Sequence, residues 1–475
     1  MTTLIATLCF ALSIATLLKF TREREVKRAT ALWIAFAWLW FASSRSPSAW
    51  VQPKGGVART ASTAYDEGNS FDRNILMGIM VLGVIVLARR SLSSTNFLTS
   101  NLPIVLFFLY CALSATWSDH GDISIRRWFR ALGDLVAVMV ILTDVDWEGA
   151  FKWIYLRLAC LLVPLSILFF RYYPNFGRNY SIHDGHVSVT GVTDDKNALG
   201  MICMLFALTV GWSMLEALKA EGPRDRKLLY GYGAVLAMAI YIISIAGSAT
   251  ATGCLIEGGC VMILAGLPKI SGRPVRVHLI VGAALGFSAF NLFAGGAILE
   301  LFGRNPTLTG RTEIWSRCFE LVTNPLLGAG YESFWLGSRL EKMWTYIEGV
   351  NQSHNGYIEI YLNLGWIGVA LLVLLLISGY RNITGALRRQ EPTARLRLAF
   401  LVAVCVYNCT EAGFKMVHPM WIALLLVAAA RPVLDVLPER RPEYRKPSRE
   451  SAETRRLANV RVNSNSPELL TRKSR

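Results

Sequence analysis

The stretch NQSHNGYIEIYLNLGWIG (residues 351–368) begins with polar residues and leads into an apolar run. That run extends from 355 to 379. The run exceeds the ~20 residues that a helix needs to cross a bilayer, so we predict a membrane-spanning helix here. Asn355, Glu359 and Asn363 recur at every fourth position and therefore share one face of that helix. Polar side chains are costly inside a membrane, and they usually face the bundle interior or a water-filled cavity.

The composition of the whole chain agrees with a membrane protein. Of its 475 residues, 53% are hydrophobic and only 17% are charged, and the mean hydropathy is +0.39. These values are unusual for a soluble chain of this length and indicate a polytopic membrane protein. About 13 apolar runs approach the length of a membrane span. They lie near 2–20, 29–43, 73–88, 101–117, 130–143, 151–170, 197–216, 228–246, 252–267, 276–302, 355–379, 395–409 and 418–436.

We therefore predict an all-α fold with about 12–13 transmembrane helices. For the two short runs, 29–43 and 130–143, a tilted, interfacial or re-entrant placement is also open. The first run follows Met1 with no basic segment before it and no small-residue cleavage site, so we expect a retained helix and not a signal peptide.

Charge predicts the orientation. The net charge is +16, but the basic residues gather in loops and in the tail, as the positive-inside rule requires, and this distribution argues against a nucleic-acid partner. With the N-terminus outside, the basic loops 21–28, 216–227 and 380–397 are cytoplasmic. The basic tail (437–475) is then also cytoplasmic, and its composition predicts a disordered segment that touches anionic membrane lipids.

The same topology places four longer loops outside the membrane: 44–72, 118–129, 171–196 and 303–354. Every unusual motif of the chain lies in these loops or at an outer helix end. We therefore predict one transmembrane domain (1–436) whose chemistry takes place at the outer face, with 303–354 as a large outer loop.

The start of the helix at 355 combines residues typical of an anion-handling site. The predicted helix N-terminus near Ser353–Asn355 points outward, and its free N–H groups favour an anion such as a pyrophosphate. His354, one of six histidines, is suited to act there as a base or a hydrogen-bond donor. Gly365 and Gly368 let another backbone approach closely. The alternative is a capped helix with a packing face only.

A second candidate lies in GRNPTLTGRTEIWSRCFELVTNPLLGAGYESFW (303–335), where Arg304 and Arg311 flank a polar turn. Apolar residues then recur at helical spacing, which predicts an amphipathic helix lying on the outer face and ending at Asn324–Pro325. Arg311 is suited to a phosphate because a guanidinium forms forked bonds to phosphate oxygens. The alternative is that this segment is only an interfacial anchor.

Two shorter motifs lie at other outer helix ends. In SVTGVTDDKNALGM (188–201), Lys196 and Asn197 follow two aspartates, and this cluster either meets a phosphate or only caps a helix. In YNCTEAGFKMVHP (407–419), Asn408 and Glu411 lie three residues apart. Glu411 is either a proton acceptor or the partner of an arginine.

Metal and nucleotide sites are not indicated. HDGH (183–186) has two histidines and one aspartate in a loop, which rarely suffice for a metal, and DVD (144–146) falls on the cytoplasmic side. No glycine-rich phosphate loop is visible. The nine cysteines form no CxxC pair, so neither a disulfide framework nor a zinc site is predicted. We expect no cofactor.

Taken in order along the chain, these motifs resemble the O-antigen ligase/polymerase superfamily. The resemblance rests on His354–Asn355 followed after nine residues by GxxG, and on the upstream GR-T-x-IW and KNALG segments. ATWSDHGDISIRRW (115–128), GSATATG (247–253) and the N-x-x-E at Asn408 point to the exopolysaccharide-production branch of ExoQ type. The resemblance runs from about 115 to 415, with a ligase/polymerase-like core at about 188–375. Val369 and the lack of an arginine in GSATATG depart from the ligase pattern, so polymerase and ligase both remain open.

The resemblance implies a metal-independent glycosyltransferase of the bacterial inner membrane with its active site facing the periplasm. The donor would be an undecaprenyl-pyrophosphate-linked glycan and the acceptor a glycan or lipid A–core, with a flippase and a chain-length regulator as further partners. Arg311 and Lys196 would hold the pyrophosphate, and His354 would activate the acceptor hydroxyl or assist departure of the leaving group. The remaining expected substrate-binding residues are Asn197, Arg304, Asn355, Glu359, Asn408 and Glu411.

Two other classes of protein compete with this hypothesis. A transporter or flippase of lipid-linked glycan also needs a polar cavity and cations, but it predicts broken helices in paired half-repeats, and no internal repeat is visible. A non-catalytic chain-length regulator or scaffold needs no histidine at the mouth of a cavity. We rank these second and third.

Overall fold

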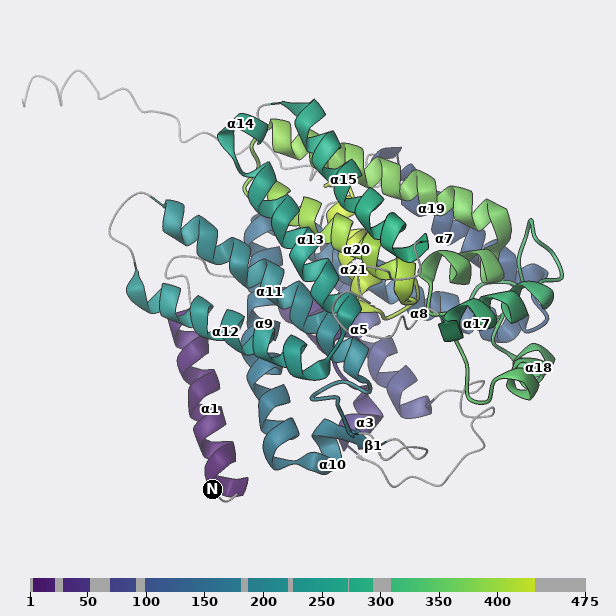
Figure 1. Cartoon of the computed structure of the whole chain (residues 1–475), viewed down its shortest axis with the longest axis horizontal. Helices are drawn as coiled ribbons and strands as arrows, with labels where there is room; N and C mark the ends of the chain where they lie inside the picture. Colours follow the sequence, from purple (N-terminus) through teal and green to yellow (C-terminus); the bar gives the residue numbers. More distant parts are fainter. Residues whose placement is uncertain are drawn as a thin grey trace, which may run out of the picture. The chain divides into compact units, whose positions relative to one another are not determined.

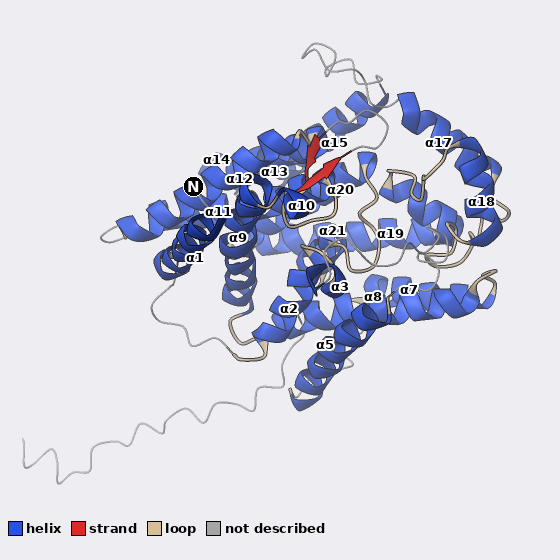
Figure 2. Cartoon of the chain, turned by 90° about the horizontal axis from the view of Figure 1, so that it is seen from below, coloured by secondary structure: helices blue, strands red, loops and turns tan. Residues whose placement is uncertain are grey.

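The structure is a computed structural model that describes residues 3–21, 29–51, 69–90, 99–180, 187–220, 225–271, 273–293 and 309–431. Figure 1 shows how its helices are arranged, and Figure 2 shows that most of these residues are helical. The small antiparallel sheet pairs β1 (Arg178–Tyr180) with β2 (Val187–Val189). The predicted all-α fold is confirmed, and the sheet was not foreseen.

Each predicted apolar run corresponds to a helix. These helices are α1 (Thr3–Phe20), α2 (Leu32–Ala42), α5 (Ser70–Arg89), α7 (Leu102–Leu113), α8 (Gly121–Leu142), α9 (Trp147–Tyr172), α11 (Lys196–Lys219), α12 (Arg226–Ala246), α13 (Ala249–Ala265), α15 (Pro274–Phe293), α19 (Gly356–Arg388), α20 (Ala394–Thr410) and α21 (Pro419–Ala428). Short helices connect them: α3 (Pro47–Val51), a 3-10 turn (Ser114–Thr116), α10 (Pro174–Gly177), α14 (Pro268–Ser271), α17 (Thr309–Glu320) and α18 (Gly337–Tyr346).

Length and composition identify two groups among these helices, to which α8, α15 and α20 do not belong. Six of them, α1, α5, α9, α11, α12 and α19, are each long and apolar enough to cross a membrane alone, and α2, α7, α13 and α21 are shorter apolar helices. The chain is therefore a multi-pass membrane protein. The total of 12–13 spans stays a prediction, because the short helices do not settle it.

The centre of the bundle is made by helices that are apolar on every side. All ten residues of α21 are buried, as are most residues of α11 and α20. In contrast, α1 and α5 leave most of their apolar side chains exposed. A helix that is hydrophobic all round is either central or faces lipid, so α11, α20 and α21 form the protein core while α1 and α5 present their apolar faces to the bilayer.

The helix α19 is broken at Gly365, which has φ 61° and ψ −166°. The segment 325–330 crosses the break: Trp366 N donates to Pro325 O at 2.9 Å, and Gly330 N donates to Asn363 O at 2.8 Å. A Cβ on Gly365 would lie 2.2 Å from Leu326 O. The predicted close approach of another backbone is thus confirmed at Gly365. Gly368 instead makes room for a leucine side chain of its own helix.

Replacing Gly365 with alanine should therefore destabilise the protein. The backbone conformation alone should cost roughly 1–3 kcal/mol, and the clash with Leu326 O adds to it. We expect a lower melting temperature and less monodisperse protein in detergent. Gly211→Ala in α11 is the matched control, since a Cβ there meets nothing within 4 Å. If both variants melt at the same temperature, the break does not require a glycine.

The outer segment 309–350 forms a second small core above the start of α19. Cys318 and Ile314 of α17 pack with Leu340 and Met343 of α18, and Phe334 and other apolar side chains complete the cluster. The two helices lie side by side at one end of the bundle (Figure 1). Burial raises the pKa of the Cys318 thiol, which acts here as a small hydrophobe.

The prediction for this segment was right about the helix and wrong about its surroundings. α17 covers Thr309–Glu320, as the spacing indicated. Its apolar face is buried against protein, so it does not simply lie on the membrane surface. An amphipathic pattern shows that one face must be covered, but it does not show whether protein or lipid covers it. α18 was not foreseen.

The ATWSDHGDISIRRW motif also has a structural role. Ser124 Oγ donates to Tyr331 O at 2.6 Å, and Ser118 Oγ donates to Ser333 Oγ at 2.7 Å. Arg339 pairs with Asp119 at 2.7 Å. These contacts fix the segment that follows α17 to the outer end of α8.

Candidate active site

The carboxylate of Glu411 joins three segments that are distant in the sequence. Its Oε1 accepts hydrogen bonds from Arg311 Nη2 at 2.9 Å and from Asn197 Nδ2 at 3.0 Å. Its Oε2 lies 3.2 Å from His354 Nδ1. Glu411 is at the end of α20, Arg311 on α17, Asn197 on α11, and His354 just before α19. Both interpretations offered for Glu411 stay compatible with this geometry, because it pairs with an arginine and also contacts the histidine.

The side chains that meet at Glu411 differ in how much of their surface is exposed to solvent. The Glu411 side chain is 7% exposed and that of Arg311 17%, whereas that of His354 is 32% exposed. The ion pair is therefore shielded from water, where it is stronger than a surface pair. Of these three side chains, that of His354 is the most accessible to an incoming molecule.

Surrounding contacts hold His354 in an uncommon conformation. Its φ is 51°, in the left-handed region that residues other than glycine rarely adopt. Trp315 Nε1 donates to Ser353 O at 2.8 Å, and the buried Glu359 carboxylate accepts from Ser353 N and from Trp335 Nε1. Residues held in rare conformations by their surroundings concentrate at functional sites.

The contact with Glu411 also sets the chemistry of the imidazole. A carboxylate beside Nδ1 favours the tautomer that carries its proton there and donates it to Oε2. Nε2 then keeps its lone pair and can accept a proton. A histidine oriented by a carboxylate in this way is a common general base.

Two cations belong to the same region. Arg311 uses one terminal nitrogen on Glu411, and the rest of its guanidinium fork has no other hydrogen bond among the described residues. Lys196, the first residue of α11, is exposed and has no side-chain partner in that part of the chain. It is adjacent to Asn197, which contacts Glu411. Arg311 is thus held against Glu411, and phosphate binding by Arg311 and Lys196 stays a prediction.

The anion site expected at the start of α19 is wrong. The Asn355 side chain accepts from Tyr357 N and Ile358 N at 3.0 Å each, and Gly356 N donates to Glu411 O at 3.1 Å. The N–H groups that an anion would need are therefore occupied by the protein itself. Asn355 caps the helix, and its Nδ2 donates to Cys409 O at 2.9 Å, so we correct its role from binding substrate to positioning His354.

Asn408 also has a structural role in place of the expected substrate contact. Its side chain is fully buried, donates to Val404 O and accepts from Gly413 N at 2.8 Å. It shapes the turn that follows Glu411. Asn408 is out of reach of a substrate because protein surrounds it on all sides.

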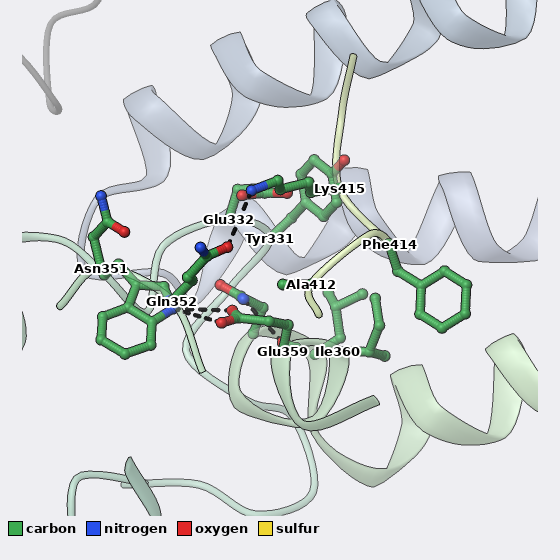
Figure 3. Close-up of a pocket in the computed structure, with 12 residues that line it drawn as sticks. Tyr331, Glu332, Asn351, Gln352, Glu359, Ile360, Ala412, Phe414 and Lys415 are labelled. Atoms are coloured by element: carbon green, nitrogen blue, oxygen red, sulfur yellow. Dashed lines mark hydrogen bonds between the residues drawn. The ribbon is translucent and has the colours of Figure 1, made fainter. Parts of the chain in front are cut away.

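Glu359 and Asn363 line a cavity, as predicted, but a small one. Its volume is about 30 Å³, which suits a water molecule and not a sugar. Figure 3 shows Glu359 beside Gln352, whose Oε1 accepts from Lys415 Nζ at 3.3 Å. Through its contacts with Ser353 and Trp335, Glu359 holds the loop that carries His354, and its expected contact with substrate stays a prediction.

The helix-capping interpretation of the segment around KNALG is confirmed, and its contact with a phosphate stays a prediction. Asp195 caps α11 by accepting from Asn197 N and Ala198 N, while the Asn197 side chain reaches Glu411. Buried Arg45, which the sequence did not single out, donates to Gly191 O at 3.1 Å and holds the loop before α11. No signal marks Arg45, because arginines are common at loop starts.

Some predictions fall outside the described residues or concern excluded sites. Arg304, the HDGH segment (183–186) and the tail (437–475) lie outside the described residues. In the DVD segment, Asp146 caps α9 and Asp144 lies 3.8 Å from Arg90. Among the residues that the structure describes, no group of three His, Cys, Asp or Glu side chains could hold a metal.

Comparison with known proteins supports the resemblance to O-antigen ligases. Residues 231–373 match the family model described as O-antigen ligase, a range that includes Arg311 and His354. This part of the chain is thus similar to O-antigen ligases. The chain is also similar to the exopolysaccharide production protein ExoQ of Rhizobium meliloti (strain 1021), with 27% identity over 295 residues. That similarity covers 59% of this chain and 65% of the relative, so somewhat less than two thirds of the relative's length is matched.

Proposed function

We propose that this chain is a membrane glycosyltransferase of the O-antigen ligase family in exopolysaccharide or O-antigen biosynthesis. It polymerises or ligates undecaprenyl-pyrophosphate-linked oligosaccharides at the periplasmic face of the bacterial inner membrane. The observation that carries the proposal is the Glu411 carboxylate, which contacts Arg311 on one oxygen and His354 on the other. One carboxylate thus positions both a base and a phosphate-binding cation.

In the proposed reaction, a hydroxyl oxygen of the acceptor sugar attacks the anomeric carbon of the donor. The bond between that carbon and the pyrophosphate oxygen breaks with its electron pair, which leaves undecaprenyl pyrophosphate. His354 Nε2 takes the hydroxyl proton, and Glu411 stabilises the imidazolium that results. Arg311 and Lys196 meet the negative charge that develops on the leaving pyrophosphate. These cations supply the charge that a metal ion supplies in many other glycosyltransferases, so we propose a metal-independent reaction.

The orientation follows from charge. The basic segment 380–397 lies at the end of α19 and the start of α20, whereas His354 precedes α19 and Glu411 follows α20, and positive loops favour the cytoplasm. This supports a periplasmic site. The acceptor would be a glycan or lipid A–core, and a flippase and a chain-length regulator would act before and beside this enzyme.

Reconstitution distinguishes the possible activities. The purified full chain is placed in liposomes with a lipid-linked oligosaccharide donor, and the products are resolved by mass. A ladder at multiples of the repeat indicates a polymerase, and transfer only after addition of lipid A–core indicates a ligase. No product with either acceptor, together with movement of the donor between leaflets, would replace the proposal by the transporter alternative.

Arginine at position 311 should not be replaceable by lysine. Arg311→Lys keeps the charge but loses the fork, so one contact, to Glu411 or to the pyrophosphate, is lost. We expect donor transfer to fall by roughly 10-fold or more, in line with a lost charged hydrogen bond. Arg317→Lys is the matched control, because Arg317 is on the same helix and pairs with Glu320 at the surface. Equal transfer by both variants would refute forked binding by Arg311.

A further inference from the structure

A second cavity lies at the end of α19 away from the candidate active site. It has a volume of about 530 Å³ and is formed by the ends of α8, α9, α19, α20 and α21. The unbroken helix α20 has Arg397 of the cavity near its start and Glu411 at its end, so the cavity and the candidate active site lie at opposite ends of this helix. Opposite ends of a membrane-crossing helix open at opposite faces of the membrane.

Positive charge dominates this cavity. Its lining includes four arginines and two glutamates: Arg381, Arg389, Arg397, Arg431, Glu148 and Glu391. Glu391 pairs with Arg389 at 2.8 Å and with Arg397 at 3.4 Å. The Glu148 carboxylate accepts from Thr393 Oγ1 at 2.6 Å. The two glutamates are therefore engaged, and a positive surplus remains.

The surplus resides on Arg381 and Arg431. The Arg381 guanidinium has no partner among the described residues, and Arg431 makes one hydrogen bond there, to Val145 O at 3.3 Å. Both side chains are exposed at the mouth of the cavity. Their donors are available to a ligand, and a guanidinium binds phosphate oxygens by paired hydrogen bonds.

The base of the cavity is rigid. Arg397 is buried, donates to Val427 O at 3.0 Å and lies over the Trp147 ring, 5.3 Å from its centroid. Each of these contacts comes from a different helix end, so they fix the cavity shape before any ligand arrives. Trp147 is also the residue type that gathers where a membrane meets water.

We propose that this cavity binds a phosphate-bearing anion at the membrane face opposite the candidate active site. Its volume lies within the range of small-molecule sites, and its mouth is at the helix ends, where lipid headgroups are found. The ligand is therefore an anionic phospholipid headgroup or a free phosphate. The inference does not depend on the proposed glycosyltransferase activity.

Native mass spectrometry of the purified full chain in detergent tests the proposal. Phosphatidylglycerol is titrated against zwitterionic phosphatidylcholine for the wild type and for the double variant Arg381→Gln/Arg431→Gln. We expect the wild type to prefer phosphatidylglycerol and the double variant to bind it roughly 10- to 30-fold more weakly. Arg388→Gln is the matched control, because this arginine is also exposed near the end of α19 but does not line the cavity.

Competition with inorganic phosphate identifies the source of the anion. If phosphate displaces the lipid, the site accepts free phosphate, and if it does not, the site is specific for the lipid headgroup. If the double variant does not fold, the single variant Arg381→Gln still tests the proposal. Its folding should be unaffected, because this guanidinium has no contact to lose among the described residues. Binding of phosphatidylglycerol by the Arg381 variants that equals that of Arg388→Gln would overturn the proposal.

Discussion

Replacing His354 with glutamine is expected to lower glycan transfer by roughly 10²–10⁴-fold, the usual contribution of a general base. Glutamine keeps the polarity and approximate size of the side chain but cannot take the proton of the acceptor hydroxyl. The Glu411–Arg311 ion pair remains intact in this variant, so donor binding should change little. The measurement is the rate of product formation in liposomes at saturating donor.

The control for this variant is another histidine. His278 on α15 is exposed and lies 2.6 Å from the Tyr380 hydroxyl through its Nδ1, outside the candidate active site. His278→Gln should transfer glycan at the wild-type rate. Both variants should reach the membrane in equal amounts. Near-normal transfer by His354→Gln would exclude a general-base role, and the transporter alternative would then become the stronger one.

Replacing Glu411 with glutamine should have an effect of similar size for a different reason. The change removes the charge that pairs with Arg311 and orients His354, and it leaves the largely shielded arginine uncompensated. Loss of one partner of a buried ion pair destabilises proteins by about 3–5 kcal/mol. We therefore expect both a lower melting temperature and a rate close to that of His354→Gln.

A variant that combines both changes distinguishes a shared mechanism from two independent defects. Residues that act as one unit give non-additive effects, so His354→Gln/Glu411→Gln should be only slightly slower than either single variant. Glu320→Gln is the matched control, since Glu320 pairs with an arginine of the same helix at the exposed surface. Rates that multiply in the double variant would show that Glu411 acts only on stability.

The sequence predicted the helices well because their signals are local. An apolar run of span length identifies a helix wherever it lies, and a capping residue such as Asp195 marks where α11 begins. The helical spacing after Arg311 likewise predicted α17, and Gly365 predicted a close approach of another backbone. Each of these depends on neighbours within a few positions along the chain.

The arrangement of the site could not be obtained in this way. Glu411 is separated from His354 by 57 positions, from Arg311 by 100 and from Asn197 by 214. Their contacts depend on how α11, α17, α19 and α20 pack, and packing follows from the shapes of whole helix faces. The sequence indicated which residues are suited to bind a phosphate or to transfer a proton. The tertiary structure brings them into contact with one carboxylate.

Tertiary structure also decided between local alternatives that the sequence left open. By its residue types, the start of α19 could either bind an anion or be capped by a side chain. In the structure, the side chain of Asn355 accepts the hydrogen bonds of its N–H groups. The apolar face of α17 had to be buried, and it packs against α18. Residue types fix which interactions are possible, but a donor or an apolar face is used by whichever partner the fold brings within contact distance.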